Sequence, residues 1–436
     1  MTRPRSRRPR EAAAEGSADH RAPTAVRTWL KVALFAVVAA VVVLTGYQYW
    51  QSGRAFALRE SCMAARQARN WAAAEQLAIE WAAFEPLLAD PLIVAAEAAM
   101  ERGNYGAAGD YLDALPDDDP KTIPALLQRV DLMFGQLSKP DEAVRTLDRI
   151  LSIDPGCCDA RHRMTFYYAI TLQRMKTVAA TRKTIELGCD LPETFVYLMG
   201  ADWLTLANTE SVNQRWLAEN PDDYQFAIAA VRGEIANRGL EDLLEDEEAA
   251  AAGSTSELAQ SREARLKDLF DEHPENLEAL AFFLQKAQTA GDVEEVTRLL
   301  ATAPQAALDD NRFWRFKAWV HGARNELEEA NAAYLKAREL FPFDAIALHE
   351  QAVIERKLGN DDEAARLADL ADRGRTLRRT ILQQPSVQAT SPETMVEIAD
   401  FIADCGETEI ADRLRARINQ MAAAPPPNGG FGPAAR

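Results

Sequence analysis

Apolar side chains recur every three or four positions over most of the chain, which is the spacing of one face of an α-helix. In the C-terminal third this pattern also repeats itself. Four pairs of residues there stand 34 positions apart: Trp314 and Leu348, Ala318 and Ala352, Ala330 and Ala364, and Ala337 and Ala371. Such a period indicates one helical unit used repeatedly, each copy burying its apolar face against the next. Since small residues let two helix axes approach closely, the pattern predicts an all-α fold of stacked helical hairpins.

Two copies of this unit are clearest, one over 311–344 and the next over 345–378. Pro342 follows the second helix of the first copy, and Gly359 with Asn360 fills the turn of the second copy. The order of a large residue, a small one, a turn, an aromatic and Pro resembles the tetratricopeptide repeat, a helix–turn–helix unit of the same length. The resemblance implies an α-solenoid of antiparallel hairpins, wound as a right-handed superhelix.

A different pattern, apolar on every face, precedes the repeats. Residues 32–44 form an unbroken apolar run, and the stretch from Trp29 to Trp50 has 22 residues. As a helix it would measure about 33 Å, enough for a hydrocarbon core of about 30 Å. Trp29 at one end, and Tyr47, Tyr49 and Trp50 at the other, suit the two membrane interfaces. The segment predicts one membrane-spanning helix.

The charge beside this helix predicts its orientation. Residues 1–31 carry eight Lys or Arg against three acids. The positive-inside rule then keeps the N-terminus in the cytoplasm and sends the repeats across an inner membrane, into a periplasmic space. The alternative is an export signal cleaved near Ala57, because Ala55-Phe56-Ala57 has the small-x-small form that a signal peptidase accepts. Both interpretations stay open on the sequence.

The regular pattern extends over most of the remaining chain, more clearly at 55–157 than at 158–276. An acidic segment with Gly, Ser and Thr interrupts it and predicts a linker, and biased composition at both ends predicts disordered tails. The expected order is a basic tail at 1–27, a transmembrane helix at 28–51, an N-terminal array at 55–243, a linker at 244–256, a C-terminal array at 257–421 and a Pro/Gly tail at 422–436.

The overall charge and the absence of known catalytic motifs argue against two classes of function, nucleic-acid binding and catalysis. A formal net charge of −18 argues against nucleic-acid partners, which require a basic stripe. The sequence shows no Gly-rich phosphate loop, His-Glu-x-x-His, Gly-x-Ser-x-Gly or paired Cys-x-x-Cys set. We therefore expect no catalysis, no metal and no cofactor.

The resemblance also implies where partners bind, since the first helix of each tetratricopeptide copy lines a concave groove. Arginine suits carboxylates and tryptophan suits a binding hot spot, so the expected partner is a protein, a peptide segment or an acidic or C-terminal tail. The alternative is that these arginines pair with Asp or Glu of neighbouring repeats. Carried onto the two clear copies, the groove positions predict a basic, aromatic-containing patch of Arg312, Arg315, Trp319, His349, Arg356 and Lys357.

Five cysteines, an odd number, give no disulfide framework. In the repeat, however, Cys158 begins a first helix and Cys189 follows the second helix of the same copy. A hairpin brings those ends to one edge, so Cys158, or its neighbour Cys157, is a candidate to bridge to Cys189 in an oxidising compartment. Unpaired, apolar cysteines are the alternative.

Together these features predict a membrane-anchored, non-enzymatic scaffold that gathers protein partners in the cell envelope. One alternative is a soluble exported adaptor released by cleavage near Ala57. Another is an accessory subunit of a membrane enzyme or secretion complex, with the chemistry supplied by a different chain.

Overall fold

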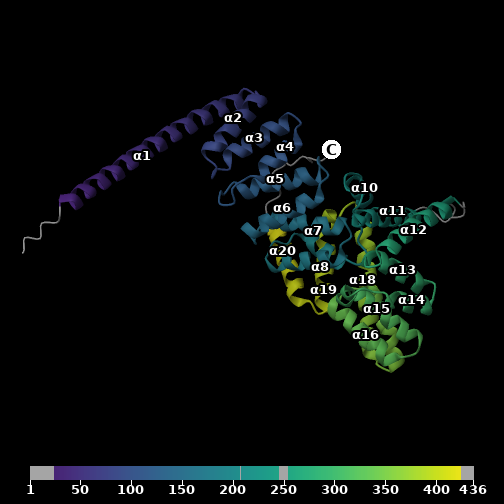
Figure 1. Cartoon of the computed structure of the whole chain (residues 1–436). Coiled ribbons are helices and arrows are strands. Elements are labelled where there is room, and N and C mark those ends of the chain that lie inside the picture. Colours follow the sequence, from purple (N-terminus) through teal and green to yellow (C-terminus); the bar gives the residue numbers. More distant parts are fainter. Residues whose placement is uncertain (1–23, 207, 245–253, 424–436) are drawn as a thin grey trace, which may run out of the picture. The chain divides into compact units, whose positions relative to one another are not determined.

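The computed structural model describes residues 24–206, 208–244 and 254–423 (Figure 1). These residues form α-helices joined by short turns, with two 3-10 helices and no strand among them, so the all-α prediction is confirmed. The chain divides into two compact units, residues 1–104 and 105–436. Most of each predicted tail and of the predicted linker, namely 1–23, 424–436 and 245–253, lies outside the described residues.

The first unit contains α1 (Thr24–Gln67), α2 (Trp71–Phe84) and α3 (Asp90–Glu101). The segment Val32–Gln67 of α1 is long and apolar enough to cross a membrane. α1 is one helix of 44 residues, which runs without a break from the predicted membrane segment at 28–51 into the first hairpin.

The sequence of α1 changes character where it meets α2. Before this point its large apolar side chains, such as Phe35 and Val43, are exposed. After it, Ala55, Leu58 and Cys62 are buried. Their spacing of three and four places them on one helix face, and α1 packs against α2 there. One helix therefore carries an apolar, uncovered half and an amphipathic, packed half.

The second unit contains the other helices. They are α4 (Tyr105–Asp113), α5 (Thr122–Phe134), α6 (Pro140–Ile153), α7 (Cys158–Ile170), α8 (Arg174–Glu186), α9 (Pro192–Met199), α10 (Thr209–Glu219), α11 (Tyr224–Leu244), α12 (Ser254–Glu272), α13 (Leu277–Thr289), α14 (Val293–Ala301), α15 (Asn311–Ala323), α16 (Leu327–Leu340), α17 (Ala345–Leu358), α18 (Asp361–Leu382), α19 (Pro392–Asp404) and α20 (Thr408–Ala423), with the 3-10 helices η1 (Gln305–Asp309) and η2 (Val387–Ala389).

The start of each first helix shows the predicted period. α13, α15 and α17 begin one repeat length apart, and each is preceded by a residue whose side chain accepts a hydrogen bond from the first turn. Such N-caps satisfy backbone N–H groups that have no partner within the helix, and each contributes about 1 kcal/mol. The three capping residues are Asn276, Asp310 and Asp344.

The turns inside the hairpins repeat with the same period. Gly291, Asn325 and Gly359 occupy the same position in three successive copies and have φ angles of 74°, 60° and 83°. This left-handed conformation ends the first helix and reverses the chain, and it favours Gly or Asn. The turn that the sequence places at Gly359 is therefore confirmed, and Asn325 serves the same purpose one repeat earlier.

The small residues of the repeat lie at the helix contacts. Ala318, Ala330, Ala352 and Ala371 are all at most 2 % exposed, and α15 packs against α16 as α17 does against α18. The tetratricopeptide-like arrangement is thus confirmed for this part of the chain. One boundary differs, because α18 continues to Leu382 instead of ending near 378.

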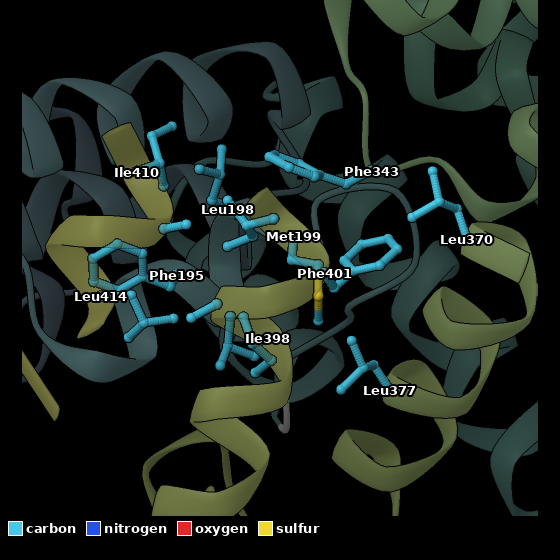
Figure 2. Close-up of a cluster of buried hydrophobic side chains, with 14 of the residues drawn as sticks. Phe195, Leu198, Met199, Phe343, Leu370, Leu377, Ile398, Phe401, Ile410 and Leu414 are labelled. Atoms are coloured by element: carbon cyan, nitrogen blue, oxygen red, sulfur yellow. The ribbon is translucent and has the colours of Figure 1, made fainter. Parts of the chain in front are cut away.

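The core of the second unit joins segments far apart in sequence. The short helix α9 packs against both α19 and α20. Figure 2 shows Phe195 and Leu198 of α9 beside Ile398 of α19 and Leu414 of α20, and all four side chains are fully buried. Three polar contacts support the same junction: Arg182 with Glu407 at 2.6 Å, Arg417 with Asp190 at 3.1 Å, and Arg413 with the Ile185 carbonyl at 2.9 Å.

Candidate functional site

The first helices α13, α15 and α17 lie side by side, as the repeat requires, with α15 touching both neighbours. Their N-terminal turns form one wall of a cavity of about 470 Å³ inside the second unit. Glu278, Arg312 and Ile346, which occupy the same position in three successive copies, all line it. The other walls come from the start of α8, the segment 197–206, α11, α18 and α19.

Arg312 is held at the cavity wall by two carboxylates. Its guanidinium lies 2.8 Å from Asp310 and 2.6 Å from Glu278 of the preceding repeat. Burial alone would lower the pKa of Arg312, but the charges of Asp310 and Glu278 outweigh it and raise the pKa. The pair also links repeats, since Arg312 and Glu278 are separated by one repeat length.

Asp310 is the centre of this arrangement and has no exposed surface. Arg174 of α8 also reaches it, at 3.4 Å. Burial favours the neutral acid, but the charges of Arg312 and Arg174 outweigh burial and hold the pKa of Asp310 at about 2. Arg174 further contacts Asp202 and Asn311, so α8 and the 197–206 segment are fixed to the start of α15.

Arg315, one helical turn further, is also buried. Its guanidinium lies 3.4 Å from Asp344, and it donates a hydrogen bond to Gln285 at 3.0 Å. Glu350 lies close to this pair. Burial raises the pKa of Glu350 to about 7, because the attraction of Arg315 is smaller than the cost of burying the charge.

These contacts separate the predicted binding patch into buried, paired residues and exposed ones. Arg312 and Arg315 are buried and paired with carboxylates, at the cavity wall. Trp319 is half-buried and packs against the core of α13 and α15. His349, Arg356 and Lys357 are exposed along α17.

Sequence reasoning did not find the partners of these arginines. Asp310 and Asp344 carried a usable signal, because they stand one repeat length apart, immediately before two first helices. Arg174 and Asp202 carried none, since the repeat is weakest in that part of the chain. Arg232 of α11, which also lines the cavity, falls in the least regular stretch.

Cys158 and Cys189 are joined by a disulfide, with their Cα atoms 5.0 Å apart. The bond links the start of α7 to the residue that follows the α8 turn, where the sequence places the two ends of one hairpin. Cys62, Cys157 and Cys405 are free thiols. Within the described part of the chain, no group of three or more His, Cys, Asp or Glu side chains is placed to hold a metal ion.

No known protein family and no curated protein matches this chain. Solved structures with helical repeats are similar at low identity. The Cut9–Hcn1 hetero-tetramer of the APC/C matches at 12 % identity over 85 % of this chain and 87 % of that one, with a TM-score of 0.34. A tetratricopeptide repeat protein from Parabacteroides merdae matches at 11 % identity over 61 % and 98 %, with a TM-score of 0.28.

Yeast Tom70 is similar in the same way, at 12 % identity over 84 % of this chain and 85 % of that one, with a TM-score of 0.26. Identities and TM-scores this low say nothing about what the chain binds.

Proposed function

We propose that this chain is a membrane-anchored scaffold that binds other proteins through its helical-repeat unit. The observation that carries the proposal is α1. Its apolar half is uncovered, and Val32–Gln67 is long and apolar enough to span a bilayer. A soluble protein rarely exposes so large an apolar surface. The predicted location is an inner membrane, with the repeats on its periplasmic side.

The course of α1 favours a retained anchor over cleavage near Ala57. A cut there would fall inside a continuous helix. It would also remove Ala55, which is 3 % exposed, from its packing site beside Leu58 and Cys62. Cleavage would thus destabilise the first hairpin.

The protein-binding surface that we propose is the exposed face of α17. Its positions correspond to the groove positions of the tetratricopeptide repeat, and they combine basic and apolar side chains. An acidic peptide or tail would match this chemistry. Arg312 and Arg315 are already paired with carboxylates, so we assign them to the cavity wall and not to this face. The exposed residues are Ile346, His349, Val353, Arg356 and Lys357.

Two measurements test the anchor. The full chain should stay with membranes during alkaline carbonate extraction, because an integral helix is not released by charge or pH. The N-terminal sequence of the mature chain should also begin before Ala55. A mature chain that starts at Leu58 and is soluble would instead support the exported adaptor.

The binding face is tested by charge reversal in the full chain, purified from detergent-solubilised membranes with its partners identified by mass spectrometry. The double variant R356E/K357E should lose about tenfold or more of the captured partner, because like charges repel an acidic segment. The control K183E/R366E reverses two charges on α8 and α18 that pair with Glu186 and Glu363, and it should retain the partner. Equal capture by both variants would exclude the α17 face.

A further inference from the structure

The cavity at the N-terminal turns of α13, α15 and α17 has the volume of a small-molecule site. Its volume of about 470 Å³ lies within the range of about 300–1,000 Å³ typical of ligand pockets. All of its lining residues fall between 169 and 401, so the whole cavity belongs to the second unit. Its existence depends on the start of α8 and the segment 197–206, which lie against the first helices of the repeats.

The side chains that line the cavity carry more positive than negative charges. Among the described residues, six arginines line it against three carboxylates, although the whole chain has a net charge of −18. Four of the arginines have acidic partners. The arginines are Arg174, Arg232, Arg312, Arg315, Arg375 and Arg378, and the carboxylates are Asp202, Glu278 and Asp344.

Two guanidinium groups in the cavity have no acidic partner within salt-bridge distance among the described residues. Arg232 lies over the Phe282 ring at 4.8 Å, and Arg378 lies over the Trp203 ring at 5.8 Å. The Nε atom of Arg232 is buried and lacks a hydrogen-bond partner, as does that of Arg315, whose residue is 5 % exposed. Buried donors without partners are costly, so each marks a place where an acceptor would be stabilised.

The electrostatics of Arg232 agree with this geometry. Burial lowers its pKa, and the charge of Arg312 lowers it further, whereas Glu278 opposes the shift. Arg378 is the more exposed of the two, and burial also lowers its pKa. A single negative charge beside Arg232 would offset both burial and the repulsion by Arg312. A polyanion is disfavoured by the three carboxylates on the same wall.

Much of the remaining wall is apolar. Figure 2 shows Met199, Phe343 and Phe401, which belong to the core around α9 and also line the cavity. Leu204, Leu206 and Ile346 extend this apolar lining. A ligand that fills the cavity therefore needs an apolar body as well as a negative group.

We propose that this cavity binds a small monocarboxylic acid with an apolar body, whose carboxylate is held by Arg232 and whose entry passes Arg378. Guanidinium groups bind carboxylates through two parallel hydrogen bonds, which suits a planar monoanion. The proposal does not rest on the membrane anchor or on the α17 face. It concerns a second ligand of the same unit.

The test uses the full chain in detergent and 3-phenylpropionate as the probe, with 3-phenylpropionamide as its uncharged match. Isothermal titration should give saturable binding of the acid, and the amide should bind about tenfold or more weakly, because it cannot form the charge-assisted pair. Inorganic phosphate and the peptide N-acetyl-Ala-Ala-Phe are included as other anions. Binding of either of these without the acid would overturn the proposal, as would equal binding of acid and amide.

Variants separate a binding role of Arg232 from a structural one. R232M removes the charge while keeping a long apolar side chain, and it should weaken binding of the acid about tenfold or more. The melting temperature without ligand should stay equal or rise, because no ion pair is lost. R232K should restore part of the affinity, and R378M should also weaken binding. The control R366M alters an exposed arginine of α18 outside the cavity. A lowered unliganded melting temperature with unchanged affinity in R232M would assign Arg232 a structural role and refute the proposal.

Discussion

Asp310 combines two tasks that are usually separate. It caps the N-terminus of α15 by accepting a hydrogen bond from the backbone N–H of Arg312 at 3.0 Å. It also compensates the charges of Arg312 and Arg174, which are both buried. An N-cap alone contributes about 1 kcal/mol, whereas removing one carboxylate partner from two buried guanidinium groups costs more. The second task therefore sets the cost of losing this side chain.

A comparison of two N-cap variants tests this difference. D310A should destabilise the second unit by about 3 kcal/mol, because it removes the N-cap and takes one carboxylate partner from each of two buried arginines, which then keep only Glu278 and Asp202. D292A removes the N-cap of α14, where Asp292 is exposed, and should cost only about 1 kcal/mol. Urea unfolding, followed by circular dichroism, measures both. Similar losses in the two variants would mean that capping, not charge, is what Asp310 contributes.

Glu350 predicts a dependence of stability on pH. Its side chain accepts hydrogen bonds from Tyr334 and Gln288, and Arg315 and Asp344 are the charged groups that face it. The folded state raises the pKa of Glu350 from its usual value of 4.5 to about 7. Its contribution is thus fully present below pH 4.5 and is lost as the pH rises through 7.

Replacing Glu350 by Gln removes this titration. E350Q should match the wild type near pH 4.5 and exceed it above pH 7, by up to about 3 kcal/mol. Melting temperatures of both proteins between these values and pH 8.5 measure the difference. Parallel curves across that range would show that Glu350 keeps an ordinary pKa in the folded protein.

At the scale of single elements, the sequence was informative wherever the signal is local. Small residues and turn residues recur at a period of 34 positions, so the hairpins of 311–378 could be placed from the amino-acid pattern alone. The pairing of Arg312 and Arg315 was harder, because carboxylates are abundant and the resemblance favoured an open groove. The packing of α9 on α20 could not be predicted, since contacts between residues some 200 positions apart leave no periodic trace.

The hairpin of α7 and α8 carries the disulfide, which closes a loop between residues 31 positions apart. A cross-link over this separation stabilises the folded state by about 3–4 kcal/mol in the chain-entropy description. C158S should therefore lower the melting temperature, and reductant should do the same to the wild type. C157S is the control: it should keep the wild-type melting temperature, and reductant should lower that melting temperature as it does in the wild type.

Thiol counting shows whether the bond forms in the cell. Protein taken from membranes and alkylated under denaturing conditions without reductant should show three reactive thiols among its five cysteines, those of Cys62, Cys157 and Cys405. Disulfides persist in oxidising compartments, so this result would also fit a periplasmic location for the repeats. Five reactive thiols would contradict both the bond and that location.

At the scale of the whole second unit, the repeats do not behave as a simple linear stack. In an open solenoid each repeat contacts only its neighbours, and stability is a sum over adjacent interfaces. Here α19 and α20 pack against α9, so the last hairpin is also a partner of the middle of the chain. The contact should stabilise the segment 197–206, which comprises the last turn of α9 and the residues after it and forms part of the cavity wall. We therefore expect the last hairpin to control both the stability of α9 and the integrity of the cavity.

Truncating a core side chain at this junction tests whether the second unit is a linear stack of repeats or a unit in which the last hairpin stabilises α9. L414A removes a side chain of α20 that has no exposed surface and packs in the core with α9, and it should cost about 2–5 kcal/mol. Amide hydrogen exchange should then accelerate in residues 192–206, although these lie more than 200 positions away in sequence. L112A, an equally buried truncation in α4, should destabilise its own neighbourhood and leave exchange in 192–206 unchanged. If L414A accelerates exchange only in α19 and α20, the last hairpin is an ordinary terminal repeat, and the cavity wall does not depend on it.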